Sequence, residues 1–86
     1  MNLNYLMSTK RGRLAYFEEE GQHLLSEVVD VEVFAPNSYR FNYKNKSYSY
    51  FPKSNKLHKQ MSNEWESDGW GWIKKFVLKT KTINNE

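Results

Sequence analysis

The stretch SYRFNYKNKSYSYFPKSNKLHK, Ser38 to Lys59, decides the fold expected for this chain of 86 residues. Aromatic side chains alternate with polar or basic ones over residues 39–44 and again over residues 47–51, which is the pattern of two β-strands with one apolar face each. Asn45-Lys46 separates the two runs, and asparagine tolerates a positive φ in a tight turn. We therefore predict a β-hairpin with a two-residue connection.

The connection sets the register of this hairpin. Phe41 is expected opposite Tyr50 and Tyr43 opposite Tyr48. Five rings then share one face, those of Tyr39, Phe41, Tyr43, Tyr48 and Tyr50. The other face takes Arg40, Asn42, Lys44, Ser47, Ser49 and Phe51. We expect the ring face to be mostly core, with tyrosine hydroxyls at its rim. The alternative is an open ring face that stacks the bases of single-stranded RNA or DNA.

Further strands flank the hairpin. Valines alternate with acids over residues 29–33 and predict a preceding strand. A type I turn at Ala35-Pro36-Asn37-Ser38 is expected to join it to the hairpin. Pro52 ends the second hairpin strand, and residues 56–61 can form a fourth, short strand.

Two helices complete the predicted domain. Apolar residues at helical spacing predict the first over about residues 9–26, capped by Ser8 or Thr9. The second begins at Ser67 or Asp68 and runs to about Lys79. Its inward side is expected to carry Trp72, Ile73, Phe76 and Val77.

The predicted fold is therefore α+β, with a three- to four-stranded antiparallel sheet and an N-terminal and a C-terminal helix on one face, in the order α-β-β-β-(β)-α. Residues 1–79 are expected to form a single domain, because a chain of this length supports one core. Residues 80–86 are polar and are expected to form a flexible tail.

Charge is distributed unevenly around a net value of +3. Residues 1–36 carry 3 bases against 6 acids, whereas residues 37–86 carry 10 bases against 4 acids, and no carboxylate lies between Glu32 and Glu64. This interval contains the cations that we predict to bind an anionic partner, Arg40, Lys44, Lys46, Lys53, Lys56 and Lys59. The alternative is a solvated sheet edge that lysines protect from aggregation.

Three tryptophans, Trp65, Trp70 and Trp72, lie close together in the sequence. Trp72 shares the inward side of the predicted helix, whereas Trp70 points elsewhere. We therefore predict Trp70 as an exposed anchor of the same binding surface. The alternative is a ring that lies over the sheet edge as local core.

The sequence contains few residues and no motifs that would support catalysis or hold a cofactor. The chain has no cysteine and two histidines, and it contains no glycine-rich phosphate loop and no Gly-x-Ser-x-Gly turn. We expect no enzyme activity, no metal and no cofactor. The absence of cysteine fits a reducing compartment, and no apolar run is long enough for a transmembrane span, which together predict the cytoplasm.

One enzymatic alternative stays open. A small metal-independent ribonuclease could use His58 as acid, Lys56 as electrostatic clamp and Tyr50 as positioning group. In size, charge and strand order the chain resembles toxin ribonucleases of the RelE and HicA types, but their characteristic motifs are absent.

A second resemblance concerns biological context. The run YFPKSNKL at residues 50–57, the single Trp65 and the segment GWGWIKK at residues 69–75 are similar to the C-terminal halves of small uncharacterised tailed-bacteriophage proteins. The resemblance implies a compact product that binds a host enzyme, polymerase or defence nuclease in the bacterial cytoplasm. It implies no role for any single residue.

The expected function is a non-enzymatic, phage-type binding protein, a monomer or homodimer, that inhibits or redirects a host protein or ribonucleoprotein complex. A defence complex that handles nucleic acid is the favoured target, because it offers phosphates or an anionic groove to the basic side chains. The alternatives are a direct single-stranded RNA or DNA binder and the ribonuclease described above.

Overall fold

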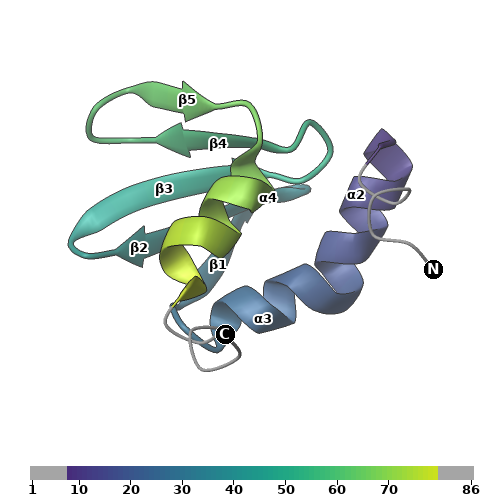
Figure 1. Cartoon of the computed structure of the whole chain (residues 1–86), viewed down its shortest axis with the longest axis horizontal. Helices are drawn as coiled ribbons and strands as arrows, with labels where there is room; N and C mark the ends of the chain where they lie inside the picture. Colours follow the sequence, from purple (N-terminus) through teal and green to yellow (C-terminus); the bar gives the residue numbers. More distant parts are fainter. Residues whose placement is uncertain (1–7, 80–86) are drawn as a thin grey trace.

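The computed structural model describes residues 8–79 as an α+β fold, with helices before and after a five-stranded antiparallel sheet (Figure 1). The N-terminal helix comprises α2 (Lys10–Tyr16), the π-helical turn η1 (Phe17–Gly21) and α3 (Gln22–Ser26). The strands are β1 (Val31–Ala35), β2 (Ser38–Tyr43), β3 (Lys46–Phe51), β4 (Lys56–Lys59) and β5 (Glu64–Glu66). The C-terminal helix comprises α4 (Gly69–Trp72) and the π-helical turn η2 (Ile73–Val77). The tail predicted at residues 80–86 lies outside the described residues.

The N-terminal helix confirms the helix predicted over residues 9–26. Thr9 is its N-cap, and the Thr9 hydroxyl oxygen accepts a hydrogen bond from the Gly12 amide at 2.9 Å. Phe17 and Leu25 are fully buried, two turns apart on one face of the helix. The apolar spacing therefore located the helix.

The sheet is a meander in the order β1-β2-β3-β4-β5, with every neighbouring pair antiparallel. The prediction of three to four strands was one strand short. The missing strand is β5, which is only three residues long and pairs with β4, where Trp65 lies opposite His58.

The register of the β2–β3 hairpin differs from the prediction by two residues. Tyr39 lies opposite Tyr50 and Phe41 opposite Tyr48. The turn consists of Lys44 and Asn45, whose φ angles of 53° and 65° are the two positive values that a type I′ turn requires. Because a shift of two residues preserves the alternation of side chains, the five rings still share one face, as predicted.

An asparagine with a positive φ occupies every hairpin turn of the sheet. These residues and their φ angles are Asn37 at 58°, Asn45 at 65°, Asn55 at 58° and Asn63 at 54°. The left-handed region is sterically costly for most residues, and asparagine is among the least penalised. Asn37 also corrects the predicted type I turn, because a positive φ at the third position belongs to type II.

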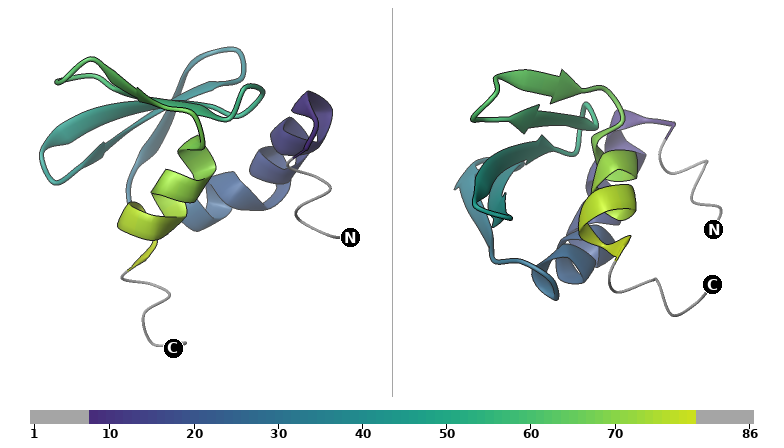
Figure 2. Two further views of the ribbon diagram at one scale, coloured as in Figure 1. Left: turned by 45° about the horizontal axis from the view of Figure 1, so that its top comes forward. Right: turned by 60° about the vertical axis from the view of Figure 1, so that its left-hand side comes forward.

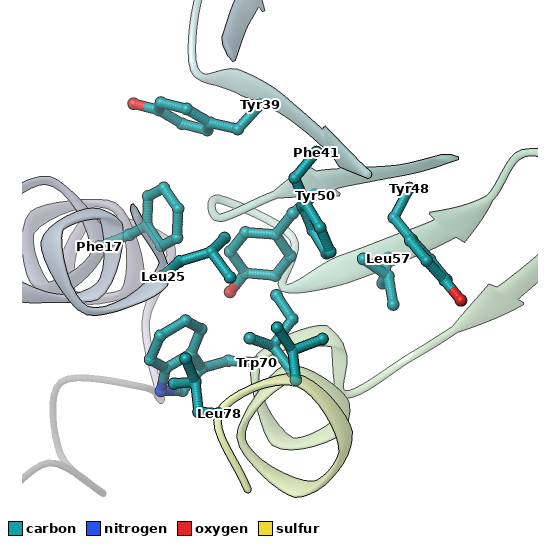
Figure 3. Close-up of a cluster of buried hydrophobic side chains, with 11 residues drawn as sticks. Phe17, Leu25, Tyr39, Phe41, Tyr48, Tyr50, Leu57, Trp70 and Leu78 are labelled. Atoms are coloured by element: carbon teal, nitrogen blue, oxygen red, sulfur yellow. The ribbon is translucent and has the colours of Figure 1, made fainter. Parts of the chain in front are cut away.

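Both helices pack on the ring face of the sheet, and the opposite face carries no helix among residues 8–79 (Figure 2). The Phe17 ring lies 4.7 Å from Tyr39 and 5.1 Å from Tyr50, measured between ring centroids. Trp70 approaches Tyr50 from the C-terminal helix, so that the two helices meet over this ring (Figure 3). The rings therefore form the core, and this face is closed to nucleic-acid bases.

Ile73 and Val77 of the C-terminal helix face inward, as predicted. The rest of the predicted stripe was wrong, because Trp70 is buried in place of Trp72 and Phe76. Trp70, Ile73 and Val77 are fully buried, whereas Trp72 is partly buried and Phe76 is 45% exposed. Positions 70, 73 and 77 follow the i, i+3, i+7 spacing of one helix face, and positions 72 and 76 lie on the adjacent face. The correction follows from the way in which the start of this helix is attached to the sheet.

Asn55 makes that attachment from the β3–β4 turn. Its side-chain oxygen accepts hydrogen bonds from the Tyr50 hydroxyl at 2.8 Å and from the Trp70 amide at 2.9 Å. Its side-chain nitrogen donates to Asp68 Oδ1 at 3.0 Å, and its backbone oxygen accepts from the Gly69 amide at 2.7 Å. Residue 69 must be glycine for this approach, because a Cβ there would lie 2.8 Å from the Tyr50 ring.

Removing the Phe41 ring should test the closed ring face. Phe41 is buried and stacks on Tyr48 at 5.3 Å, so Phe41→Ala should lower the free energy of unfolding by about 3 to 5 kcal/mol. Denaturant titration measures the change. Val33→Ala, at an exposed position of β1, is the control and should cost less than about 1 kcal/mol. A Phe41→Ala protein as stable as the control would mean that the ring is not core.

Two substitutions separate the contribution of the Asn55 side chain to stability from that of its positive φ angle. Asn55→Gly keeps the positive φ but removes three side-chain hydrogen bonds, which should cost about 2 to 3 kcal/mol. Asn55→Ala should cost about 1 kcal/mol more, because a Cβ is strained in the left-handed region. Asn45→Gly at the exposed β2–β3 turn is the matched control and should be nearly neutral in denaturant titration. An unaltered stability of Asn55→Gly would show that the side chain does not hold the helix.

Candidate binding surfaces

The six predicted cations do not form one surface. Arg40 and Lys56 lie on the open face of the sheet, because they alternate with the buried side chains of Phe41 and Leu57. Lys46 and Lys59 lie on the other face, as cross-strand partners of Tyr43 and Tyr48. The structure therefore divides these four cations between the two faces of the sheet, and the binding role predicted for them stays a prediction.

The remaining two cations occupy turns. Lys44 lies in the β2–β3 turn, at the end of the hairpin. Lys53 lies in the β3–β4 turn, where its backbone oxygen accepts a hydrogen bond from Arg13 Nε at 2.8 Å. The two turns lie at opposite ends of β3, which separates these cations by the length of the strand.

Trp70 is not an exposed anchor. Its side chain is 2% exposed and contacts Tyr16, Phe17 and Tyr50 at centroid distances of 5.7 to 6.3 Å. Gly21 makes room for the neighbouring Phe17 ring, since a Cβ at that position would lie 2.9 Å from it. Trp70 is therefore part of the core, which was the alternative prediction for this residue. Trp65, in contrast, is 55% exposed.

The first candidate surface is a group of rings and lysines at the end of the β2–β3 hairpin, on the helix side. Each of three rings has a lysine Nζ near its centroid: Lys44 at 5.4 Å from Tyr43, Lys59 at 5.5 Å from Trp72, and Lys75 at 5.4 Å from Phe76. The Tyr43 hydroxyl donates to the Phe76 backbone oxygen at 3.0 Å, and the Trp72 and Phe76 rings lie 5.0 Å apart. We call these six residues the hairpin-end cluster.

An open cleft of about 350 Å³ adjoins this cluster. It is lined by Lys46, Ser47, Tyr48, Lys59, Met61, Ser62, Glu64 and Trp72. Met61 is 73% exposed at its rim. Glu66 holds Lys59 beside the cleft through an ion pair of 2.9 Å, and this hydrogen bond raises the pKa of the lysine above its usual range.

The second candidate surface lies on the open face of the sheet. Phe34, Phe51, Trp65 and His58 form a chain of ring contacts, with centroid distances of 6.2 Å, 5.8 Å and 4.4 Å between successive members. The Arg40 guanidinium lies 4.5 Å from the centroid of Phe34, and Lys56 is the cross-strand neighbour of Phe51. We call these six residues the open-face strip.

The three residues of the ribonuclease alternative do not converge. His58 and Lys56 belong to the open-face strip, whereas the Tyr50 side chain is buried on the other face and its hydroxyl donates to Asn55. Burial, and secondarily the charge of Asp68, raises the pKa of Tyr50 well above its usual range. Tyr50 therefore cannot position a substrate beside His58. The expected absence of enzyme activity stays a prediction.

The sequence analysis gave no binding role to several members of the two surfaces, namely Phe34, Phe51, Trp65, Trp72, Lys75 and Phe76, nor to Met61 in the adjoining cleft. Phe34 lies on the open face because it alternates with Val33, whose cross-strand partner Tyr39 is on the ring face. Trp65 lies on the open face because β5 pairs with β4. Asn63, two residues before Trp65, was the sequence signal for a further turn and hence for this strand.

Comparison with models of protein families, with curated proteins and with solved structures gives no match. Between residues 8 and 79, no helix has the length and apolar character needed to cross a membrane. In the same range no three His, Asp or Glu side chains gather closely enough to hold a metal ion.

The contrast between Trp70 and Trp65 can be measured. Trp70→Ala should lower the free energy of unfolding by about 3 to 5 kcal/mol, because it empties the space between the two helices. Trp65→Ala should cost less than about 1 kcal/mol. Denaturant titration gives both values, and acrylamide quenching of Trp65→Phe should show the loss of the most accessible indole. Equal destabilisation by the two alanine variants would contradict the assignment of Trp70 to the core.

Proposed function

We propose that this chain is a non-enzymatic binding protein that attaches to an acidic surface of a partner protein through the hairpin-end cluster. In the phage-type context that the sequence resemblance implies, the partner is a host protein machine, and a defence complex that handles nucleic acid is the favoured target. Attachment inhibits or redirects that machine in the bacterial cytoplasm.

The observation that carries this proposal is the pairing of every exposed or partly exposed ring of the cluster with a lysine. Trp72 and Phe76 offer large apolar area, and Met61 adds a flexible apolar side chain beside them. Aromatic residues and methionine are enriched where protein interfaces are fully desolvated. The cluster therefore has the composition of an interface centre.

Charge favours an acidic partner at this place. Lys44, Lys46, Lys59 and Lys75 surround the rings and the cleft, and the nearby carboxylates are those of Glu64, Glu66 and Asp68. Glu66 is already engaged by Lys59. Lysines around an apolar centre accelerate encounter with an anionic surface and reject cationic ones.

Charge reversal tests the proposal. Lys44→Glu, Lys46→Glu and Lys75→Glu combined should leave the fold intact, because each position is exposed and should change stability by less than about 0.5 kcal/mol. Partner affinity should fall at least about 100-fold, since like charges now face each other. Arg40→Glu with Lys56→Glu, on the open face, is the matched control.

The measurement is affinity capture from bacterial host lysate with and without nuclease, followed by titration of the purified captured protein. The same protein should be retained by the wild type and by the open-face control, should be lost with the hairpin-end variant, and should resist nuclease. Phe76→Ala should weaken the purified complex at least about 10-fold. Unchanged binding by the hairpin-end variant and by Phe76→Ala would refute this assignment of the interface.

A further inference from the structure

We propose that the open-face strip is a separate binding site for single-stranded nucleic acid, with bases stacked on Trp65 and Phe34 and phosphates held by Arg40 and Lys56. This goes beyond the function proposed above, because the site lies on the opposite face of the sheet and takes a different class of ligand. Its residues are also distinct from the tyrosine face that the sequence had suggested as a stacking platform.

The first support is the exposure of rings on an uncovered sheet. Trp65 is 55% exposed and Phe34 is 39% exposed, on the face that lacks a helix among the described residues (Figure 2). Phe51 lies between them and contacts both rings. The strip therefore crosses the sheet from β1 to β5 and presents a ring at each end.

The second support is that each exposed ring has a cation beside it. The Arg40 guanidinium lies over Phe34 at 4.5 Å. Lys56 and Trp65 together line an open hollow of about 440 Å³ with Glu66 and Ser67. A nucleotide offers a planar base and a phosphate linked to it, and a ring beside a cation provides for both.

The chemistry of this face favours bases over a protein partner. The strand positions directed to the open side carry Glu32, Phe34, Ala35, Ser38, Arg40, Asn42, Ser47, Ser49, Phe51, Lys56, His58 and Trp65. Within the described strands the small Ala35 is the one aliphatic side chain of this set, and Glu32 is its one carboxylate. Planar rings, cations and small polar groups match single-stranded nucleic acid, whose bases stack on aromatic side chains.

The Trp65 ring is also held in place before any ligand binds. It stacks on His58 at 4.4 Å with an interplanar angle of 27°. His58 Nε2 is 2.8 Å from Asn63 Oδ1, so the imidazole itself is fixed by the β4–β5 turn. A stacking surface with a fixed orientation loses less conformational entropy on binding.

The test measures binding of fluorescein-labelled octamers of uridine and of thymidine by anisotropy at 50 and 200 mM salt. Trp65→Ala and Phe34→Ala should each weaken binding about 10-fold, and Trp65→Phe should stay within about 3-fold of the wild type because it keeps a stacking ring. Two phosphate contacts predict a salt slope near −1.4, hence about 7-fold weaker binding at the higher salt. Arg40→Gln with Lys56→Gln should bring this slope close to zero.

Spectroscopy and ligand controls separate stacking from charge. Binding should quench the fluorescence of the exposed Trp65, and Trp65→Phe should lose most of that quenching while it still binds. An abasic octamer, which keeps the phosphates, and a duplex of the same length should both bind at least about 10-fold more weakly.

Lys44→Gln with Lys46→Gln, at the hairpin end, is the matched protein control and should bind the octamers as the wild type does. If the hairpin-end control were the only variant to lose octamer binding, the nucleic-acid site would lie at the hairpin-end cluster, and the proposal would be overturned. Equal binding of the abasic octamer, or wild-type affinity in both Trp65→Ala and Phe34→Ala, would also overturn it. None of these results depends on whether the hairpin-end cluster captures a protein.

Discussion

The hydrogen bonds of Asn55 are the constraint on which the rest of the structure depends. Its side chain joins Tyr50 in the sheet to the backbone of Trp70 and to the capping carboxylate of Asp68. This arrangement starts the C-terminal helix directly against β4 and brings the glycine at position 69 into contact with Tyr50. Once the start of the helix is placed, its rotation follows, and Trp70 must enter the core. Trp72 and Phe76 are then left at the hairpin end.

The same constraint separates the two candidate surfaces. Both helices are held on one side of the meander, so neither helix covers the rings on the other side. The two surfaces share aromatic rings and cations but differ in the remaining chemistry. The hairpin end adds Met61 and a cleft, which suits a protein, whereas the six residues of the open-face strip include no aliphatic side chain.

Much of the fold was accessible from local patterns. Alternation over residues 39–51 assigned the correct face to every ring of the hairpin, and helical spacing located the N-terminal helix. The fifth strand was missed because three residues carry almost no periodicity. The spacing of Asn37, Asn45, Asn55 and Asn63 would have revealed it, since each occupies a turn with a positive φ. The two-residue error in register arose because Lys44, whose residue type gives no turn signal, also adopts a positive φ.

By itself, the sequence determined which side chains share a face, because a strand alternates with a period of two and a helix with a period near 3.6. It also determined the excess of cations over acids from residue 37 onwards. Only the tertiary structure decided which face would be covered and which tryptophan would be buried. The C-terminal helix carries two overlapping apolar stripes, one through Trp70 and Ile73 and one through Trp72 and Phe76, and local spacing permits either to face inward. The choice is made by contacts such as the hydrogen bond that Asn55 Oδ1 accepts from the Trp70 amide, fifteen residues away in the chain. No local pattern encodes a contact of that kind.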